Sequence, residues 1–315
     1  MKRVVVIGEI LVEIMADTRG DGFIASQPLT GPYPSGAPAI FADQMAMLGQ
    51  PVSIVSTVGD DDFGRLNLNR LQRDGVDISA VHIDTERPTG SAFVRYRSDG
   101  SRDFVFNIRH SAAGRVHKTN VVEDCLSDVD HVHVMGSSLS SPEFIELNIE
   151  AIECVHARGG TVSFDPNLRK EILSPELLTA TKHILSKTDL FLPSGDEVSL
   201  FTKSTDVASA IKELLANGVR AVVHKCGTDG ATYYDQHCNH FSHAFSVQEV
   251  DPTGAGDCFG ATFTACWLRQ TDPLEALRLA AASGAIAVTE RGPMEGTATL
   301  ESLMSFLENQ RIQIV

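Results

Sequence analysis

Short runs of β-branched residues alternate along the chain with longer segments in which apolar residues recur every three or four positions. The short runs are typical of buried strands, and the longer segments are typical of helices packed on a core. The predicted strands are Val4–Ile7, Val52–Thr57, His131–Met135, Thr161–Asp165, Leu190–Leu192 and Arg220–Lys225. The predicted helices cover residues 37–48, 64–74, 142–158, 175–186, 205–217, 256–270, 273–289 and 299–309. This alternation indicates an α/β fold whose mainly parallel sheet is covered on both faces.

One stretch departs from this rhythm. Between Thr89 and Ile108 apolar and polar residues alternate with a period of two, and residues 98–101 (Ser-Asp-Gly-Ser) are typical of a hairpin turn. We expect this strand pair to project from the parallel domain as a lid over a site or as a contact between subunits. Because no long linker, repeat or low-complexity tract interrupts the chain, we expect one domain over residues 1–315, with lid segments at about 10–30 and 88–110.

Composition limits the environment and the partners. The 315 residues are 43% hydrophobic, which is enough for a sizeable core, and no stretch reaches the ~20 apolar residues of a membrane span. The first residues lead directly into a predicted strand, without the layout of a signal peptide. A net charge of −15 argues against nucleic acid and anionic membranes as partners. Six cysteines without CxxC pairs are typical of reduced thiols, so we expect a cytoplasmic protein.

Residues 250–257 (Val-Asp-Pro-Thr-Gly-Ala-Gly-Asp) carry the strongest chemical signal, directly before an apolar helical run. Small residues let the backbone turn tightly, so that N–H groups at the start of a helix can point at an anion. An adjacent carboxylate then faces the group to which that anion is attached, as phosphoryl transfer to a hydroxyl requires. The segment predicts a small-molecule kinase with Asp257 as the catalytic base and an anion hole formed by Gly254, Ala255 and Gly256. A helix-capping aspartate and an ordinary glycine-rich turn are the simpler explanations.

Other nucleotide-binding signatures are missing from the sequence. There is no GxxxxGK[ST] segment, which argues against a P-loop NTPase. The HRD and DFG motifs of protein kinases are absent as well. Gly8 follows the first predicted strand, but GxGxxG is not present there, so a dinucleotide-binding domain is not expected.

Several segments, in this order, resemble the ribokinase-like (PfkB-type) carbohydrate kinases, and the resemblance covers nearly the whole chain. They are Gly8-Glu9-Ile10-Leu11-Val12-Glu13, Ser35-Gly36-Ala37-Pro38-Ala39, Val58-Gly59-Asp60-Asp61-Asp62-Phe63-Gly64, Phe164-Asp165-Pro166-Asn167-Leu168-Arg169, the DPTGAGDCF segment from Asp251, and Gly284-Ala285. The resemblance implies a three-layer α/β/α sandwich with a mainly parallel sheet and a small inserted β-sheet lid. It also implies ATP and Mg²⁺ as cofactors and a sugar, sugar phosphate or nucleoside as substrate. The sequence departs from the family pattern at Ile40, where many relatives carry a sugar-binding Asn.

The resemblance assigns substrate contacts to three regions. Glu13 stands where relatives place an acidic residue that bonds sugar hydroxyls, and Gly36 would let the sugar approach the backbone. Arg109 follows the lid hairpin and could bind a carboxylate or a hydroxyl. Three further candidates follow a predicted buried strand, where ligands collect in open α/β sheets, namely Asp165, Asn167 and Arg169. A surface carboxylate, a solvated arginine and a structural ion pair are the simpler explanations for Glu13, Arg109 and Arg169.

The resemblance assigns nucleotide and metal contacts to the C-terminal half. The nucleotide candidates are Lys225, Gly227, Gly230, Thr253, Ala282, Ala285 and Gly292. Glu197 would hold Mg²⁺ through water, although Ser194 replaces the asparagine that relatives carry beside it. Asp251 would help to bind a monovalent cation such as K⁺. Tight turns, helix packing and a helix-terminal acid explain these residues equally well.

We therefore expect transfer of the γ-phosphoryl group of Mg-ATP to a hydroxyl of a ketohexose of the tagatose or fructose type. The segments GEILVEIM and GPYPSGAPAIF look closest to kinases of such sugars. A 2-keto-3-deoxygluconate kinase is the first alternative, since Arg109 or Arg169 could pair with the carboxylate of that sugar. A nucleoside kinase is the second, and a catalytically silent sugar or nucleotide sensor is an alternative of a different class. Exposed strand edges in the lid predict a homodimer.

Overall fold

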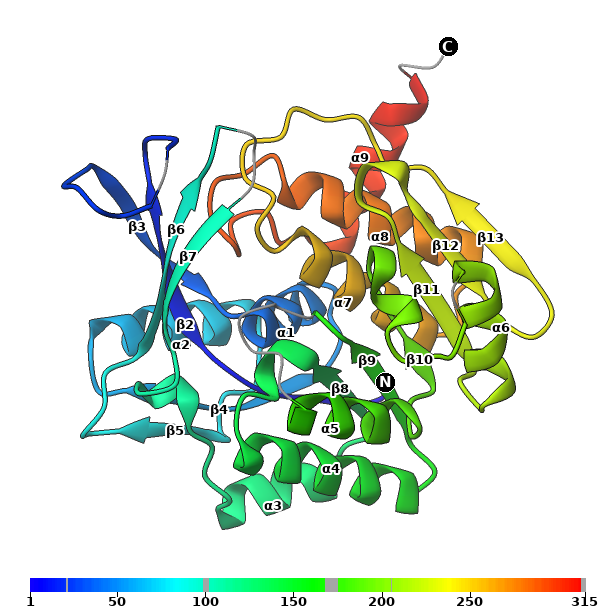
Figure 1. The fold of residues 1–315 in the computed structure, drawn as a ribbon, viewed down its shortest axis with the longest axis horizontal. Helices are drawn as coiled ribbons and strands as arrows, with labels where there is room; N and C mark the ends of the chain where they lie inside the picture. The colour runs from blue at the N-terminus through cyan, green and yellow to red at the C-terminus, as the bar shows by residue number, and fades with distance from the viewer. Residues whose placement is uncertain (21, 99–101, 168–174, 205, 313–315) are drawn as a thin grey trace.

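A nine-stranded sheet forms the centre of this computed structural model, which describes residues 1–20, 22–98, 102–167, 175–204 and 206–312 (Figure 1). The strand order is β13-β12-β11-β10-β9-β8-β1-β4-β5. The parallel strands are β1 (Val4–Ile7), β4 (Val52–Gly59), β5 (Val81–Asp84), β8 (His131–Met135), β9 (Thr161–Asp165), β10 (Leu190–Phe191) and β11 (Ala221–Lys225). The antiparallel strands β12 (Ala231–Tyr234) and β13 (Asn239–Ser242) extend one edge. Arg169, a predicted substrate contact, and residues 99–101 of the predicted hairpin turn lie outside the described residues.

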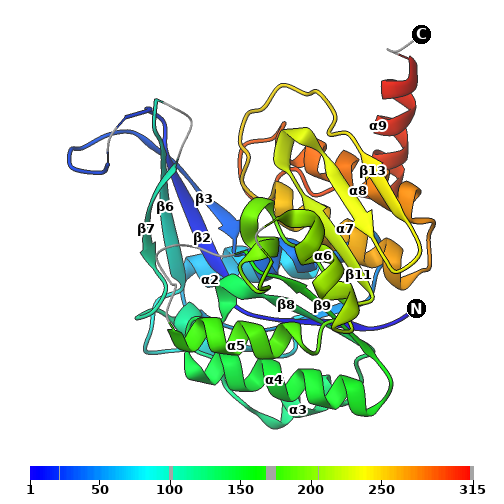
Figure 2. The same cartoon turned by 45° about the vertical axis from the view of Figure 1, so that its right-hand side comes forward.

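Helices cover both faces of this sheet (Figure 2). One face packs against α1 (Ala37–Met47), α2 (Asp62–Asp74), α7 (Ala255–Leu268), α8 (Pro273–Ala287) and α9 (Leu300–Ile312). The other packs against α3 (Asn120–Ser127), α4 (Pro142–Ala157), α5 (Pro175–Leu185) and α6 (Val207–Ala216). None of the helices that the structure describes is long and apolar enough to span a bilayer.

Strand β1 shows why the sheet is buried on both faces. Val4 and Val6 belong to the core under α1 and α7, whereas Val5 and Ile7 belong to the core under α4. Successive strand side chains point to opposite faces, so a continuous apolar run fills both cores at once. The predicted three-layer α/β/α sandwich with a mainly parallel sheet and a smaller second sheet is confirmed.

The smaller sheet has the order β3-β2-β6-β7 and projects from the large one (Figure 1, left). Its strands are β2 (Leu11–Ala16), β3 (Leu29–Ser35), β6 (Gly90–Tyr96) and β7 (Arg102–Asn107). Strands β6 and β7 pair antiparallel, which confirms the strand pair predicted from the period-two pattern. We call this four-stranded sheet the lid; its closing over a site stays a prediction.

Asp61, from the segment VGDDDFG, fixes the root of the lid. It caps α2 by accepting the Gly64 N–H at 2.8 Å, and it accepts the backbone N–H and the hydroxyl of Thr89, each at 2.7 Å. Burial by itself raises the pKa of Asp61, but these hydrogen bonds outweigh it and hold that pKa below its usual value. Since Thr89 directly precedes β6, this segment ties the start of the lid hairpin to the large sheet.

Candidate active site

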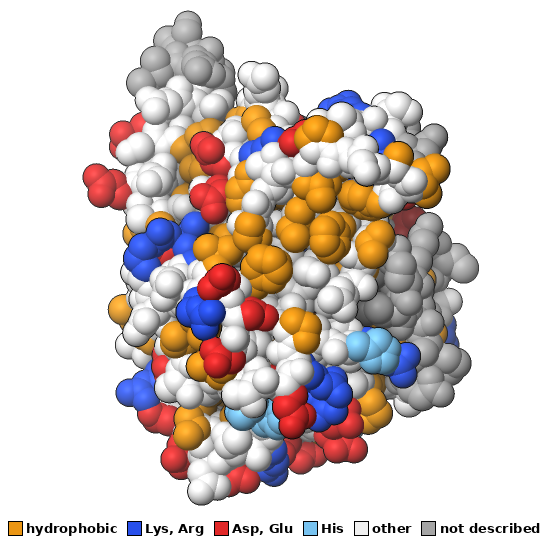
Figure 3. All heavy atoms as spheres, turned by 90° about the vertical axis from the view of Figure 1, so that its left-hand side faces the viewer, with side chains coloured by type: hydrophobic (Ala, Val, Ile, Leu, Met, Phe, Trp, Pro, Cys, Tyr) orange, Lys and Arg blue, Asp and Glu red, His pale blue; other side chains and the backbone are white. Residues whose placement is uncertain are grey.

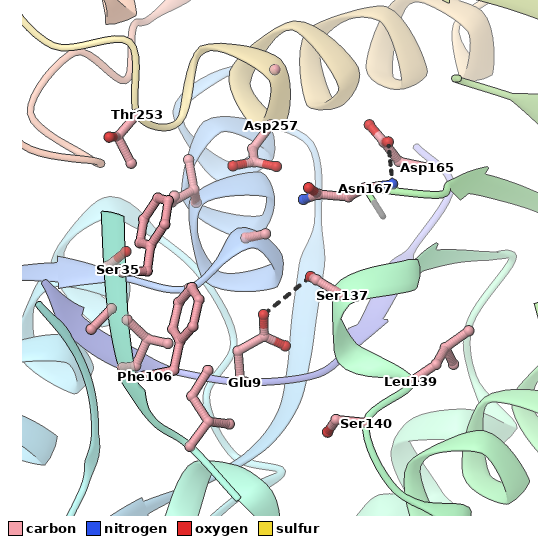
Figure 4. Close-up of a pocket in the computed structure, with 18 of the residues that line it drawn as sticks. Glu9, Ser35, Phe106, Ser137, Leu139, Ser140, Asp165, Asn167, Thr253 and Asp257 are labelled. Carbon is pink, nitrogen blue, oxygen red and sulfur yellow. Dashed lines mark hydrogen bonds between the residues drawn. The ribbon is translucent and has the colours of Figure 1, made fainter. Parts of the chain in front are cut away.

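A cavity of about 990 Å³ opens where the carboxyl ends of the parallel strands meet the lid. Its wall includes Glu9 after β1, Asp165 at the end of β9 and Lys225 at the end of β11. Phe106 of the lid and Asp257 of α7 complete the enclosure (Figure 4). Open α/β sheets bind ligands at this edge, because the loops that leave parallel strands converge there.

The turn before α7 takes the shape that an anion hole needs. Gly254 is the N-cap residue of α7 with a φ of 82°, and a Cβ there would collide with the carbonyl oxygen of Pro293. Only glycine adopts this conformation without strain, so the turn can lead directly into the helix. Gly254, Gly256 and Asp257 line the cavity, whereas Ala255 is not among its lining residues. The first-turn N–H groups of α7 have no helical partner and carry the positive end of the helix dipole.

Asp257 points into the cavity from α7, and Glu9 points into it from the opposite side (Figure 4). The side chain of Asn167 lies beside Asp257, and Asn167 has a positive φ of 38°, which asparagine tolerates better than most residues. Its backbone N–H donates to Asp165 Oδ1 at 3.2 Å. The predicted base and the predicted substrate contact therefore line the same cavity.

Two buried carboxylates, Glu9 and Glu13, lie in the cavity wall. Glu9 is 6% exposed and accepts the hydroxyls of Ser137 at 3.2 Å and Ser138 at 2.6 Å. Glu13 is 4% exposed and accepts the hydroxyl of Ser35 at 3.2 Å. We call the region around these two residues the sugar chamber, after the substrate that the sequence predicts. Carboxylates are strong acceptors for hydroxyl groups, so the chamber suits a polyol.

Gly36 forms part of the wall of the sugar chamber, and its close approach to a sugar stays a prediction. Its φ is 113°, and a Cβ there would collide with the carbonyl oxygen of Glu9. Glu9 itself was not predicted as a site residue. Its position directly after β1, at the carboxyl end of a parallel strand, is the signal that points to it.

The inner face of the lid brings aromatic rings to the cavity. Phe104 and Phe106 are stacked with centroids 5.0 Å apart, and the Arg102 guanidinium lies 5.4 Å from the Phe104 ring centre. Ala92 and Ile108 line the same side. The sequence analysis did not single out these rings, although the period-two alternation of the hairpin places them on one face.

Two predicted ligands, Asp165 and Lys225, are paired with each other. Lys225 Nζ donates to Asp165 Oδ2, and both side chains are buried in the cavity wall. The ion pair neutralises the lysine charge, because burial strengthens the interaction of opposite charges. Predicted contacts of these residues with substrate or nucleotide remain predictions.

Glu197 and Ser194 also lie in the cavity wall, and the Ser194 N–H donates to Glu197 Oε2 at 2.7 Å. Thr253 and the exposed Arg109 line the cavity as well. Glu197 thus serves as a helix-terminal acid and faces the cavity at the same time.

Six further residues that the sequence analysis assigned to nucleotide or cation binding do not line the cavity. They are Gly227, Gly230, Asp251, Ala282, Ala285 and Gly292. Ala282 is fully buried in α8, and Gly292 packs closely against the Tyr33 ring. Asp251 is buried behind the turn that leads to Gly254. Ligand contacts of these six residues stay predictions.

Comparison with known proteins identifies the class. Residues 1–300 match the pfkB family of carbohydrate kinases. The 2-dehydro-3-deoxygluconokinase of Thermoproteus tenax is 32% identical over 304 residues, which cover 94% of this chain and 91% of that protein. The chain therefore belongs to the pfkB family, and the predicted resemblance is confirmed.

Solved structures agree with this assignment. An E. coli protein described as a candidate ribokinase II, in complex with ATP and Mg²⁺, is 45% identical with a TM-score of 0.92, over 98% of this chain and 100% of that chain. A double mutant of Vibrio cholerae fructokinase with fructose, ADP and potassium ion bound is 27% identical with a TM-score of 0.82, over 98% of both chains.

Proposed function

We propose that this protein is an ATP-dependent kinase that phosphorylates a hydroxyl of a ketohexose of the tagatose or fructose type. The observation that carries the proposal is that Asp257, at the start of α7, faces the same cavity as Glu9 and Glu13. A base, an anion-binding helix start and a polyol chamber are the components that phosphoryl transfer to a sugar needs.

In the proposed reaction Asp257 accepts the proton of the attacking sugar hydroxyl. The hydroxyl oxygen forms a bond to the γ-phosphorus, the bond from that phosphorus to the bridging oxygen breaks, and ADP leaves. The N–H groups of the turn from Gly254 to Gly256 stabilise the negative charge on the transferring group. A loose transition state needs proton acceptance only late, so a carboxylate is a strong enough base for this step.

The donor set of the cavity suits Mg²⁺, which prefers oxygen ligands and keeps several waters. Glu197 would hold the ion through water from the cavity wall. Bound to the phosphates, Mg²⁺ would neutralise part of their charge.

The charges in the sugar chamber favour a neutral sugar over an acidic one. Glu9 and Glu13 accept hydrogen bonds from hydroxyls and repel a substrate carboxylate. Among the described residues of the cavity wall, the lysine cation is paired with Asp165. The two arginines, Arg102 of the lid and Arg109 just after it, are exposed to solvent. A 2-keto-3-deoxygluconate kinase stays the second candidate, because Arg109 reaches the same cavity and the relative from Thermoproteus tenax carries that name.

A monovalent cation near Asp251 is also part of the proposal. This carboxylate accepts hydrogen bonds from Tyr96, Thr253 and Gly292, which leaves about one of its four acceptor positions for an ion. Turnover in K⁺ compared with Na⁺ at equal ionic strength tests this point. Equal turnover rates in K⁺ and Na⁺ would contradict a cation site at Asp251.

We further propose a homodimer that forms through the outer face of the lid. That face carries an apolar groove of about 400 Å³ lined by Phe23, Leu29, Phe93 and Val105, with polar residues at its margin. Figure 3 shows hydrophobic side chains gathered on this side of the molecule. A second copy presents the same groove, as a two-fold interface requires. A cytoplasmic location is proposed as well, supported by six cysteines that are all free thiols.

A substrate panel tests the function. ADP release is measured with Mg-ATP and tagatose, fructose, ribose, 2-keto-3-deoxygluconate or adenosine. We expect the highest kcat/KM with a ketohexose. A higher kcat/KM with 2-keto-3-deoxygluconate or adenosine would replace the proposed substrate, and ATP binding without turnover on any acceptor would support a sensor.

A further inference from the structure

Tyr96 of the lid is hydrogen-bonded to Asp251, in the turn that leads to the anion hole. Tyr96 ends β6, and its hydroxyl donates to Asp251 Oδ1 at 2.5 Å and lies 3.5 Å from Thr253 Oγ1. Arg102, on the neighbouring strand β7, donates from Nη1 to Thr253 Oγ1 at 3.2 Å. Both strands of the lid hairpin thus contact the same Asp-Pro-Thr turn, about 150 residues away in the sequence.

Asp251 is a junction between three parts of the chain. Its carboxylate is 1% exposed, and it also accepts the backbone N–H groups of Thr253 and Gly292, each at 3.0 Å. A buried carboxylate needs such donors, because it has lost its water. Burial and the neighbouring Asp251 carboxylate raise the pKa of Tyr96 well above its usual range, so the phenol remains a donor.

The turn held in this way directly precedes the helix start that carries the anion hole. Gly254 follows Thr253, and Cys258 N–H donates to the Gly254 carbonyl at 2.8 Å to begin α7. A change in the turn therefore changes the direction of the N–H groups that face the transferring phosphoryl group. Electrostatic stabilisation depends on such donors being fixed before the reaction.

The same lid hairpin carries Phe104 and Phe106, which wall the cavity beside the sugar chamber. The hairpin that walls the cavity is therefore the same hairpin that is hydrogen-bonded to the turn before α7. Building on the kinase activity proposed above, we propose that Tyr96 is a positioning residue, which makes the geometry of the anion hole depend on the lid lying over the sugar. Efficient transfer then requires a covered sugar, and water is a poor acceptor because an open lid leaves the turn without its Tyr96 hydrogen bond.

Tyr96→Phe tests this coupling, and Tyr233→Phe is a matched control. Tyr233 on β12 donates to Asp235 Oδ2 at 2.9 Å, so its variant also loses a phenol–carboxylate hydrogen bond, but neither residue lines the cavity. For Tyr96→Phe we expect kcat for the sugar to fall about tenfold, with KM for ATP changed by less than about threefold. The ratio of ADP formed to sugar phosphate formed should rise, because the variant slows transfer to the sugar, whereas transfer to water with an open lid never had the Tyr96 hydrogen bond to lose. Tyr233→Phe should match the wild type in both quantities.

Equal kcat and equal product ratio in the two variants would overturn the proposal. If thermal melting shows that Tyr96→Phe is not folded, Arg102→Gln removes the other lid contact. It is expected to lower kcat about threefold and raise the same ratio, and unchanged values would overturn the proposal. A wild-type enzyme that uses another sugar would refute the proposed substrate but not this coupling, which is then measured with that sugar.

Discussion

Lys225 and Asp165 form a buried ion pair in the cavity wall, although their strands β11 and β9 are separated in the sheet by β10. Removing one partner leaves the other charge buried without compensation. We expect Asp165→Asn to lower the free energy of unfolding by about 3–5 kcal/mol.

The double variant Asp165→Asn/Lys225→Met should recover part of this loss, since neither charge is then buried alone. Urea unfolding of both single variants and the double variant measures the coupling energy. The ion pair would contribute little to stability if each single variant lost less than about 1 kcal/mol of unfolding free energy, or if the two losses simply added up in the double variant.

In the proposed function Glu9 and Glu13 contact the hydroxyls of the sugar. Glu13→Gln keeps the size of the side chain and removes its charge, so a charge-assisted hydrogen bond becomes a weaker neutral one. We expect KM for the sugar to rise about tenfold or more, with KM for ATP nearly unchanged. Glu9→Gln should act in the same direction and should also reduce the discrimination against 2-keto-3-deoxygluconate. Unchanged sugar KM values in both variants would place the sugar elsewhere.

Asp43 should make stability depend on pH. Burial raises the pKa of Asp43 to about 7, although Arg70 and Thr297 oppose this, and Oδ1 has no hydrogen-bond partner among the described residues. The folded state therefore keeps a proton that the unfolded chain releases near pH 4, so this group destabilises the fold progressively as pH rises from about 4 to 7.

Asp43→Asn removes this titration. We expect the difference in unfolding free energy, wild type minus variant, to fall by about 2 kcal/mol between pH 5 and pH 8. Urea unfolding of the wild type and Asp43→Asn at both pH values measures this difference, and the surface variant Asp272→Asn is the control. A difference that stays constant would mean that Asp43 is ionised throughout this range.

The outer face of the lid is predicted to form the dimer. Val105 is 53% exposed on this face, and Val105→Asp would place a charge in the apolar groove. Light scattering should give a dimer for the wild type and a monomer for the variant at micromolar concentration. Val121→Asp, at a similarly exposed valine on α3, should remain dimeric. A monomeric wild type would refute this interface.

The sequence predicts the inner strands of the large sheet, β11-β10-β9-β8-β1-β4, because they are short and mostly apolar, as β1 shows. The strands at its two edges, β5, β12 and β13, were not predicted. The turn before Asp257 is predictable for another reason: Gly254 has a positive φ that only glycine adopts without strain, so glycine at this place indicates a tight turn. Glu9 is harder to predict, since glutamates are mostly exposed and a buried one is unusual. Short elements such as β5 and α3 carry too few residues for a clear period.

Contacts between distant segments set the limit of the sequence analysis. The pairing of Asp165 with Lys225 and that of Tyr96 with Asp251 depend on how strands are ordered and how the lid lies. Both aspartates were predicted as ligand contacts from their motifs, and only the structure shows that each is bonded to another side chain. A motif specifies which residues lie near a site, but their partners follow from the tertiary fold.

The central claim is that Asp257 acts as the base for phosphoryl transfer to a sugar, and Asp257→Asn tests it most directly. The control is Asp272→Asn, which makes the same chemical change at the N-cap of α8, where asparagine caps equally well. With the preferred sugar, Asp257→Asn should lose at least about two to four orders of magnitude in kcat while still binding ATP, and the control should retain wild-type turnover. Wild-type turnover in Asp257→Asn would contradict the proposed mechanism.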